Sequence, residues 1–416
     1  MKTRPILTAA KLVAFALSGA LLAGCSESTE SPQQVQSPEP AVPYEETLRL
    51  ALETAQPGDV IEIPEGRHTF TRGLTLNTDG VTIRGAGMDA SVLDFSGQIA
   101  GAEGLLVNAS DFTIEDVGLE DSPGDALKIN EGTNIVIRRV RTEWTRGPHT
   151  ENGAYGIYPV QTENTLVEGS VAIGASDAGI YVGQSRNVIV RDSRAEFNVA
   201  GIEIENTVGA DVYNNVATNN TGGILVFNMP DLPQEGHSTR VFKNQVTGNN
   251  TGNFAPPGGA VAGVPAGSGV IINSNDKVEI FDNEISDNRT ANVLISSFFS
   301  AAYSARETAP TFDPYPETIY IYDNAFTGGG DAPDRDELEQ LRAAMFAESG
   351  RLPDVVWDGI ANPDKADGEH AICVNNGEAV LLNIDAGNNY ENVSTDMAAH
   401  SCDHQKLAEI VLTTGG

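Results

Sequence analysis

The sequence has few basic residues, few aromatic residues and no long apolar run. Of its 416 residues only 25 are Lys or Arg, against 58 Asp or Glu, which gives a formal net charge of −33. This charge excludes a surface that binds nucleic acid, because a phosphate backbone would be repelled at long range. Aromatic residues make up only 6% of the chain, yet 40% is apolar, so a core can be built from Val, Ile, Leu and Ala and disorder throughout is excluded.

The N-terminus has the pattern of a secretion signal. Lys2, Arg4 and Lys11 precede a twelve-residue apolar run, 12–23, which is too short to remain as a membrane-spanning helix. The run ends in Leu22-Ala23-Gly24-Cys25, which resembles the lipobox of bacterial lipoproteins. That resemblance implies a diacylated Cys25 as the mature N-terminus, and Ser26 after it implies transfer to the outer membrane. The alternative is an ordinary signal peptide in which Cys25 is incidental.

This pattern predicts a signal peptide over 1–24, a flexible Ser-, Glu- and Pro-rich tether over 25–43, and a mature protein anchored to the outer membrane on its periplasmic or outer side. Cleavage removes three basic residues and no acidic one, which leaves 22 against 58 and a net charge of −36. Two cysteines then remain besides the lipidated one, Cys373 and Cys402. Outside the cytoplasm a disulfide between them is expected, and two cysteines alone would make an incomplete metal site.

A short β-branched segment followed by a polar pair recurs along the middle of the chain. Successive central residues are 31, 23, 30, 23, 22, 29, 39 and 41 positions apart. A 22-residue unit holds three short strands that cannot bury a face alone, whereas a propeller blade needs roughly forty residues at every step. The pattern therefore predicts an all-β fold, a single-stranded right-handed parallel β-helix over 44–330. The central residues are Ile83, Ile114, Ile137, Val167, Val190, Val212, Val241, Ile280 and Ile321.

The repeat also predicts the corners and the two ends of the solenoid. Four asparagines fall at one corner of successive rungs, where Asn tolerates left-handed backbone and can bond the main chain of the next rung. An amphipathic stretch at 48–54 predicts a helix that caps the first rung. Residues 331–416 are expected to form a small α+β cap with a helix over 334–348, the disulfide, and Trp357 in the cap core. The four asparagines are Asn215, Asn244, Asn283 and Asn324.

Insertions in the repeat gather around the first strand of each rung. Segments 141–156, 228–238, 247–269 and 297–318 all adjoin it. Loops rising on both sides of one strand stack predict a groove with that stack as its floor. Alternate residues of these strands point outward onto the floor. The outward residues are Lys128, Asn130, Tyr158, Val160, Tyr181, Gly183, Glu203, Glu205, Leu225 and Phe227.

The outward residues include a file of Tyr158, Tyr181 and Glu203 on neighbouring rungs, about 4.8 Å apart. Tyrosine rings pack on the C–H faces of sugars while carboxylates accept bonds from hydroxyl groups, so the file suits a saccharide. The alternative is an aromatic ladder beside a solvated acidic face. Glu203 and Glu205 share a face roughly 7 Å apart, and such repulsion is tolerated most readily at metal or catalytic sites.

Residues 152–223 resemble the catalytic stretch of β-helix mannuronan C5-epimerases. That family's YGFDPH segment matches YGIYPV from Tyr155 to Val160, and the strand phase agrees. Tyr158 stands where the family has Asp, Val160 where it has His, and Val199 where it has Arg. Only Tyr155 of the family's catalytic set is present, so the resemblance implies the fold and disfavours epimerisation by that mechanism.

Over most of 44–416 the chain is similar to bacterial parallel β-helix repeat lipoproteins of the pectate-lyase-like superfamily. The segments that carry this resemblance are YGIYPVQ, SDAGIYVGQS, VAGIEIEN, GGILVFNMPDLP and NNTGNFAPPG. It implies the architecture and no particular reaction.

These features predict a lipid-anchored extracytoplasmic protein that binds and processes a polysaccharide, as a lyase, an epimerase or a hydrolase. The candidate catalytic residues are Tyr158, Tyr181, Glu203, Glu205 and Lys128, and the candidate substrate-binding residues are Tyr155, Asn130, Phe227, His149 and Arg146. No cofactor is indicated except Ca²⁺, for which Glu203, Glu205 and Asp177 are candidate ligands. The acidic charge favours a neutral glycan over a polyanion unless Ca²⁺ bridges the two.

The alternative is a non-catalytic glycan-binding or assembly lipoprotein that uses the solenoid as a rigid surface. It accounts for the absent epimerase residues and fits an apolar groove end at Leu225, Phe227, Phe298 and Phe299. Either way we expect a monomer whose partner is a polysaccharide or oligosaccharide, which meets the membrane only through its lipid and does not bind nucleic acid.

Overall fold

The computed structural model describes residues 43–347, 350–365 and 368–413, and the chain from Pro43 onward forms one compact unit. The expected signal peptide, the lipidated Cys25 and the tether up to Val42 lie outside the described residues and stay predictions. None of the described helices combines the length and the apolar character that a membrane span requires.

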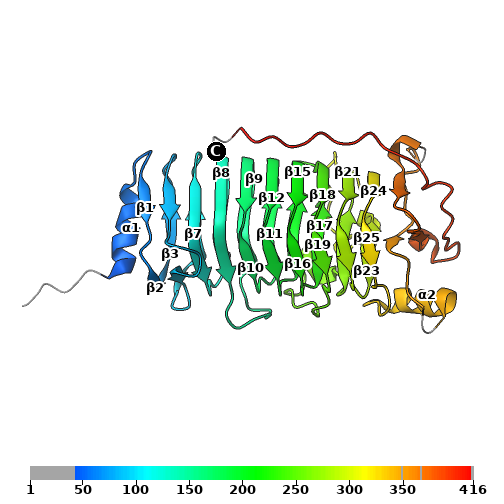
Figure 1. Cartoon of the computed structure of the whole chain (residues 1–416), viewed down its shortest axis with the longest axis horizontal. Helices are drawn as coiled ribbons and strands as arrows, with labels where there is room; N and C mark the ends of the chain where they lie inside the picture. Colours follow the sequence, from blue (N-terminus) through cyan, green and yellow to red (C-terminus); the bar gives the residue numbers. More distant parts are fainter. Residues whose placement is uncertain (1–42, 348–349, 366–367, 414–416) are drawn as a thin grey trace, which may run out of the picture. The chain divides into compact units, whose positions relative to one another are not determined.

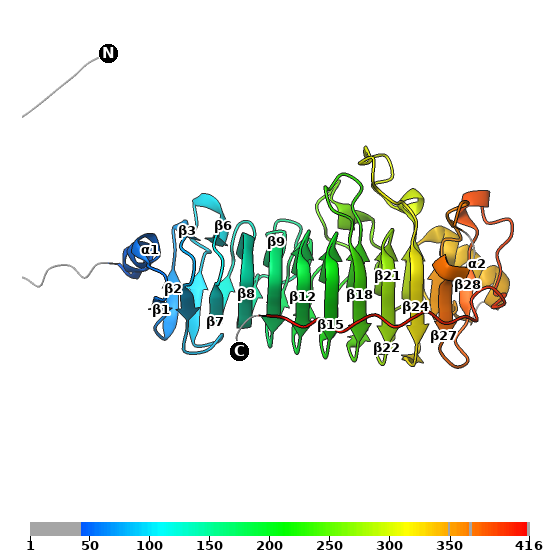
Figure 2. The same ribbon diagram turned by 90° about the horizontal axis from the view of Figure 1, so that it is seen from above.

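The strands from β1 to β28 form a parallel β-helix, the fold that the sequence predicts, in which each strand pairs with the equivalent strand of the next rung (Figures 1 and 2). Three stacks of strands, here named the first, second and third sheets, make up its walls. The first sheet contains β3 (Arg72–Leu76), β6 (Ala100–Val107), β11 (Ala178–Gly183), β14 (Ala200–Glu205), β17 (Gly222–Phe227), β20 (Ser268–Asn273), β23 (Ala291–Ser296), β26 (Val355–Trp357) and β28 (Leu381–Asn383).

The other two sheets complete each turn. The second sheet contains β1 (Val60–Glu62), β4 (Thr82–Arg84), β12 (Arg186–Arg191), β15 (Val208–Tyr213), β18 (His237–Phe242), β21 (Asp276–Phe281), β24 (Glu317–Tyr322) and β27 (Ile372–Asn375). The third sheet contains β2 (Gly66–Thr69), β5 (Ser91–Asp94), β10 (Val171–Ile173), β13 (Arg194–Glu196), β16 (Val216–Thr218), β19 (Gln245–Thr247), β22 (Glu284–Ser286) and β25 (Ala325–Thr327). Three longer strands run through more than one sheet, namely β7 (Thr113–Glu120), β8 (Leu127–Glu143) and β9 (Tyr155–Glu168).

The register of the second sheet is the repeat that the sequence predicts. Each central residue from Ile83 to Ile321 pairs with the next one along the series. All nine side chains are buried in one continuous core. Each β-branched residue stacks on its equivalent in the next rung, so the core is a continuous column of side chains. The spacing of the repeat in the sequence is enough to predict which residues stack.

The predicted corner asparagines form a ladder that joins successive rungs. The side-chain amides of Asn215, Asn244 and Asn283 each donate to the Oδ1 of the next member, at 3.0, 3.0 and 2.9 Å. The left-handed backbone predicted for these asparagines lies one residue earlier in each rung, because the ladder residue itself turns inward to bond its neighbours. A second ladder at the corner after the third sheet, which the sequence reading missed, consists of Asn198, Asn220, Asn249 and Asn288.

The N-terminal end of the solenoid is capped by α1 (Tyr44–Thr54), as predicted. Leu48 and Leu52, one turn apart, enter the main core and close the first rung. Two glutamates in the first turn favour a helix here because they complement the partial positive charge of its N-terminus.

At the C-terminal end the parallel pairing continues past residue 330, where the sequence predicts that the cap begins. Trp357 of β26 pairs with Ile295 and belongs to the main core, not to a separate cap core. The helix α2 (Asp336–Phe346) lies beside it, and Cys373 and Cys402 form the expected disulfide. Short 3₁₀ turns occur at η1 (Ala260–Gly263), η2 (Phe298–Ser300), η3 (Gly368–His370) and η4 (Ala386–Asn388).

The chain from 403 to 413 turns back and runs along the outer surface of the second sheet (Figures 1 and 2, red). The backbone N–H of Leu407 donates to Glu279 of β21 at 2.7 Å, and that of Ile410 donates to Asp211 of β15 at 3.1 Å. We name residues 403–413 the C-terminal strap. The first sheet stays clear of the strap and carries the candidate site.

Candidate functional site

The outward residues of the first sheet lie where strand alternation places them. On β11, Ile180 and Val182 enter the main core, whereas Tyr181 belongs to a second apolar cluster on the outer face. Tyr181 pairs across the sheet with Glu203, and Gly183 pairs with Glu205. The rungs therefore bring the predicted tyrosines and glutamates together.

Three tyrosines form one aromatic cluster on this face. The ring centroids of Tyr155 and Tyr158 are 4.4 Å apart, those of Tyr155 and Tyr181 are 4.7 Å apart, and those of Tyr158 and Tyr181 are 4.9 Å apart. The rings are tilted or edge-on to one another, not stacked as a flat ladder. Burial raises the pKa of all three hydroxyls, so each keeps its proton at neutral pH and can donate a hydrogen bond.

Tyr181 reaches along its own strand to Glu205. Its ring lies over Gly183, where a Cβ would overlap the ring and the hydroxyl. The Tyr181 hydroxyl then donates to Glu205 Oε1 at 2.6 Å. The missing side chain at residue 183 therefore sets the contact between the aromatic cluster and the carboxylates.

Glu203 and Glu205 are buried carboxyl groups, and only Glu205 has partial compensation, from the Tyr181 hydroxyl and the charge of Arg306. Their exposed fractions are 1% and 8%, and Glu203 Oε2 has no hydrogen-bond partner. Burial raises the pKa of Glu205 to about 7, although the bond from Tyr181 opposes the shift. Burial and the charges of Asp177 and Glu205 hold the pKa of Glu203 well above its usual range. The alternative of a solvated acidic face is therefore wrong for Glu203 and Glu205, because both are buried.

Asp177 completes the acidic group from the turn before β11. Burial and the charge of Glu205 raise its pKa to about 7, and a hydrogen bond with Tyr155 opposes the shift. Across the part of the chain that the structure describes, no Lys, Arg or His forms an ion pair with Asp177, Glu203 or Glu205. Asp177 and Glu205 therefore exchange protons near neutral pH, whereas Glu203, whose pKa is held well above its usual range, favours its protonated form.

Lys128 lies at the edge of this group and contacts the aromatic cluster. Its ammonium is 4.9 Å from the centre of the Tyr158 ring and 3.9 Å from carboxylate oxygens of both Asp125 and Glu103. Burial raises the pKa of Asp125 to about 6, and Lys128 opposes that shift. Lys128 therefore interacts with Asp125 and Glu103 and forms no ion pair with Asp177, Glu203 or Glu205.

Loops cover the floor that the sequence predicts as an open groove. Phe254, Val261 and Val264, from the insertion before β20, pack against Tyr181 and its neighbours in the outer cluster. Figure 2 shows loops between β15 and β24 rising on one side of the solenoid (green to yellow). The loops therefore cover the groove over part of its length, because their apolar residues pack against the apolar residues of the first sheet.

The structure does not bring every predicted binding residue to the acidic group. Asn130 bonds Asn108 in a separate amide pair at 3.3 Å. Arg146 bonds Asn152 within its own loop, and His149 accepts a backbone N–H two residues on. Phe227 is brought close, because it pairs in register with Glu205.

Sequence reasoning missed Tyr303, in the loop after β23. Its hydroxyl donates to Asn273 Oδ1 at 2.6 Å, and burial together with the charges of Glu205 and Glu203 raises its pKa. The guanidinium of Arg306 lies 5.8 Å from its ring. In the sequence, Tyr303 and Arg306 lie within one long insertion, 297–318. Nothing in that segment indicates which rung the loop will contact.

The carboxylates that come close enough to share a metal ion lie elsewhere. Among the described residues, carboxylate oxygens of Asp276, Asp313 and Glu317 lie within 4.8 Å of one another, and these three could hold a metal such as calcium. Lys365 already bonds Asp313 at 2.9 Å and Glu317 at 3.3 Å. Asp276 and Glu317 pair in register, so the repeat could have revealed part of this triad. The predicted calcium ligands Asp177, Glu203 and Glu205 form no comparable set.

The comparisons with known proteins agree with this architecture. Residues 79–233 match the family described as the right handed beta helix region. No curated protein matches the chain. The A-module of the Azotobacter vinelandii mannuronan C-5 epimerase AlgE4 has a similar solved structure, with a TM-score of 0.51 and 20% identity over 69% of this chain and 85% of that one.

Two further solved structures are similar at lower scores. The AlgE6 A-module from the same organism has a TM-score of 0.47 and 18% identity, over 68% of this chain and 82% of that one. The pectate lyase Pel9A has a TM-score of 0.44 and 15% identity, over 77% and 85%. The chain thus contains a right-handed β-helix region and shares its fold with the AlgE4 A-module.

Proposed function

We propose that this chain is a carbohydrate-active enzyme that processes a polysaccharide on the first-sheet face, with Glu205 as the proton-transferring group. The observation that carries the proposal is an acidic group beside three tyrosines, in which Glu203 and Glu205 are buried and Asp177 is partly buried. The pKa of Glu205 near 7 suits it to give and take a proton at neutral pH. Structural carboxylates are usually paired instead, which makes this group costly unless it is used.

Of the three reaction types that the sequence left open, the site best supports hydrolysis of a neutral glycoside. Asp177 and Glu205 repel each other, so near pH 7 one is ionised while the other keeps its proton. A glycoside hydrolase needs this state, because one carboxylic acid protonates the leaving oxygen while a carboxylate takes a proton from the attacking water. A uronate substrate would need a cation beside its carboxylate, and Lys128 is engaged by Asp125 and Glu103.

The test is turnover of a polysaccharide panel by the full-length protein. Inulin, amylose, xylan, polygalacturonate and alginate would be incubated with the protein, with Ca²⁺ or with EDTA. We expect new reducing ends on a neutral polysaccharide in both conditions, and a loss of roughly 10²–10⁴-fold in Glu205→Gln. The exposed Glu163→Gln is the matched control. Unsaturated uronates that absorb ultraviolet light would show a lyase instead, and undiminished turnover by Glu205→Gln would exclude the proposed role.

The second candidate is a non-catalytic glycan-binding protein, and the low exposure of the carboxyls favours it. With only 1% of Glu203 and 8% of Glu205 exposed, the acidic group also serves as a buried support for the tyrosines. Retardation in an affinity gel that contains the same polysaccharides, with no turnover of any of them, would favour binding alone.

We also propose that the protein is lipid-anchored at Cys25 in the outer membrane, on the basis of the lipobox resemblance. Radiolabelled palmitate should enter the wild-type protein and not Cys25→Ser, which should lose its membrane fractionation. Label in both proteins, or in neither, would contradict the anchor.

A further inference from the structure

Beyond Glu205 the first-sheet face carries a cavity of about 350 Å³. Its floor consists of outward residues from three successive rungs, Phe227 of β17, Ile271 of β20 and Leu294 of β23. A cavity of this size, largely apolar with a few polar groups, is typical of a small-ligand site.

Two loops meet above part of this floor. Gly263, in the loop before β20, lies so near Ala302, in the loop after β23, that a Cβ at residue 263 would overlap the Ala302 methyl group. The Arg335 guanidinium donates to the Gly263 carbonyl and ties the same loop to the start of α2. The Ala309 N–H donates to Pro230 O at 2.7 Å, which joins the loops after β23 and β17. A strand-lined groove thus becomes a roofed cavity here.

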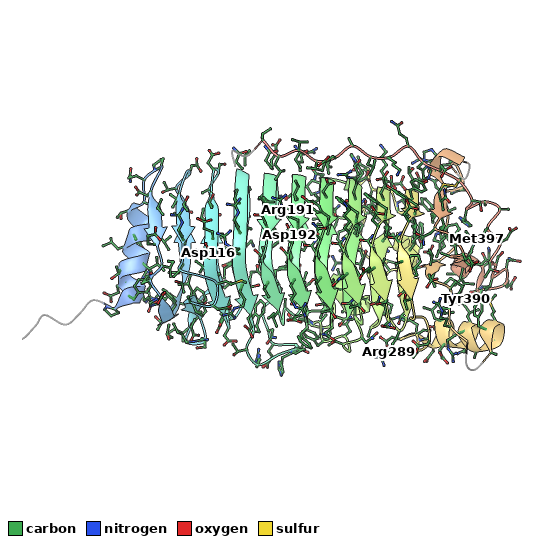
Figure 3. The ribbon with its side chains drawn as sticks, viewed as in Figure 1. Asp116, Arg191, Asp192, Arg289, Tyr390 and Met397 are labelled. Atoms are coloured by element: carbon green, nitrogen blue, oxygen red, sulfur yellow. A yellow bond between two sulfur atoms is a disulfide. The ribbon has the colours of Figure 1, made fainter. Side chains whose placement is uncertain are left out.

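The far wall of the cavity comes from the C-terminal cap. Leu338 of α2 and Tyr390 line it, and Figure 3 labels Tyr390 beside α2. The Asp358 carboxylate also lines it, but its Oδ2 already accepts bonds from Ser297 and Ser300. Arg335 and Glu337 line it as well, so the cavity combines aromatic and aliphatic surface with one basic and two acidic side chains, which suits a neutral sugar better than an anion.

The cavity adjoins the acidic group. Phe227 pairs in register with Glu205, so floor and carboxyl are one rung apart, about 4.8 Å. Tyr303 lines the cavity, and the charges of Glu205 and Glu203 help to raise the pKa of its hydroxyl. A saccharide unit in the cavity would have its neighbouring linkage about one rung away, on the side of Glu205.

We infer that the cavity receives the terminal units of a neutral saccharide chain, so that this protein acts from a chain end. The inference deepens the proposed hydrolysis and rests on it. The contact between Gly263 and Ala302 obstructs an internal segment of a long chain, because the chain would have to continue beyond the cavity on both sides. A chain end can enter the cavity without crossing this contact.

Binding tests the cavity independently of turnover. The full-length protein would be titrated calorimetrically with maltotetraose, cellotetraose, xylotetraose and inulotetraose. We expect at least one to bind, and binding to weaken at least tenfold in Ala302→Trp and in Leu294→Trp, which fill the cavity from the roof and from the floor. Ile99→Trp, at a position that is 88% exposed and outside the cavity, is the matched control. Binding of none of the four, or wild-type affinity in a folded filling variant, would overturn the inference.

The products of turnover separate this inference from the proposed hydrolysis and serve if neither filling variant folds. A chain-end enzyme releases one short product from the earliest time points. A broad mixture of lengths from the start would overturn the chain-end inference and leave hydrolysis standing. Tetrasaccharide binding that the filling variants lose, without turnover of any polysaccharide, would remove hydrolysis and leave the cavity as a binding site.

Discussion

The position of the Tyr181 ring depends on the absence of a side chain at Gly183. Because side chains alternate along a strand, residues 181 and 183 point to the same side, and a tyrosine can lie along the strand only if the second position is empty. The pairing of Gly183 with Glu205 then puts the Tyr181 hydroxyl on that carboxyl. The absence of a side chain at Gly183 thus allows the hydrogen bond from Tyr181 to Glu205.

We expect Gly183→Ala to separate Tyr181 from Glu205. The new Cβ would overlap the ring, so the ring must swing away into a packed cluster, at a cost of about 1–3 kcal/mol in unfolding free energy. Turnover of the substrate should fall at least tenfold, and urea denaturation should show the stability loss. Gly97→Ala, where a Cβ meets only ordinary contacts, is the control. Unchanged turnover in Gly183→Ala would mean that this bond does not matter.

Tyr181→Phe should shift the alkaline side of the pH profile upward. The Tyr181 hydroxyl stabilises the ionised form of Glu205 and so lowers its pKa. Without that bond the pKa rises above about 7, and Glu205 keeps the proton that it donates to a higher pH. The rate at each pH, measured as kcat/KM, tests this. A shift to lower pH, or none, would contradict a role for Glu205 as the acid.

Strand alternation predicts which residues face outward, but not how deeply they are covered. Tyr181, Glu203 and Glu205 lie where the period of two places them. Their burial depends on Phe254 and Val264, which come from an insertion one or two rungs later in the sequence. The path of a loop depends on contacts with other loops, and no local pattern encodes these.

The C-terminal strap matches the spacing of the rungs it crosses. Glu279 and Asp211 lie two rungs apart, roughly 10 Å at the usual strand spacing. They bind the N–H groups of residues 407 and 410, and three residues of extended chain cover about 9 Å. Arg240, on the rung between, pairs with Asp211. The strap thus fastens several rungs of the second sheet together.

We expect truncation after His404 to lower the melting temperature by about 1–4 °C. It removes two bonds to buried carboxylates, and bonds of this charged kind contribute more than neutral ones. Truncation after Leu412 leaves both bonds in place and is the matched control. Equal melting of the two truncated proteins would show that the strap contributes nothing to stability.

The repeating elements could be predicted from the sequence, and the strap could not. A strand that recurs every 22 residues or more reveals its partners through its own period, as the pairing of Ile83 with Ile114 shows. The segment 403–413 has no repeat, and its partners Glu279 and Asp211 are more than a hundred residues away. Sequence analysis therefore recovers the solenoid and its capping helix but not what crosses its outside.

The whole molecule combines a large negative charge with carboxyl groups whose pKa values are raised strongly, among them groups at the candidate site and at the acidic triad. At the candidate site, burial raises the pKa of Asp177 and Glu205 to about 7. At the acidic triad, burial together with Asp313 and Glu317 raises the pKa of Asp276 to about 7. Paired surface carboxylates shift the other way, as at Asp116 (Figure 3), where a bond from Arg139 lowers the pKa. The net effect on stability depends on the pH range in which each kind titrates.

We expect the unfolding free energy to fall as pH rises from about 5 to about 8. Below the unfolded-state pKa, near 4, the buried carboxyls are protonated in both states and have no effect. Between about 4.5 and 7 only the folded state keeps these protons, so the unfolded state gains stability with each rise in pH. Above about 7 the folded protein must hold the charges in its interior at full cost. Self-repulsion of a chain with net charge −33 acts in the same direction.

Urea denaturation of the full-length protein between pH 5 and pH 8 measures this dependence, and we expect a difference of about 3 kcal/mol. Combining Glu205→Gln with Asp276→Asn should reduce the dependence of the unfolding free energy on pH, because an amide does not ionise. The double variant should also be more stable than wild type at pH 8. Each single variant should remove part of the slope, since the two groups lie in separate clusters and their effects should add. Glu163→Gln, exposed on β9, should leave the slope unchanged. Stability that is flat or increases over this range would mean that compensation not seen among the described residues holds these carboxyls ionised.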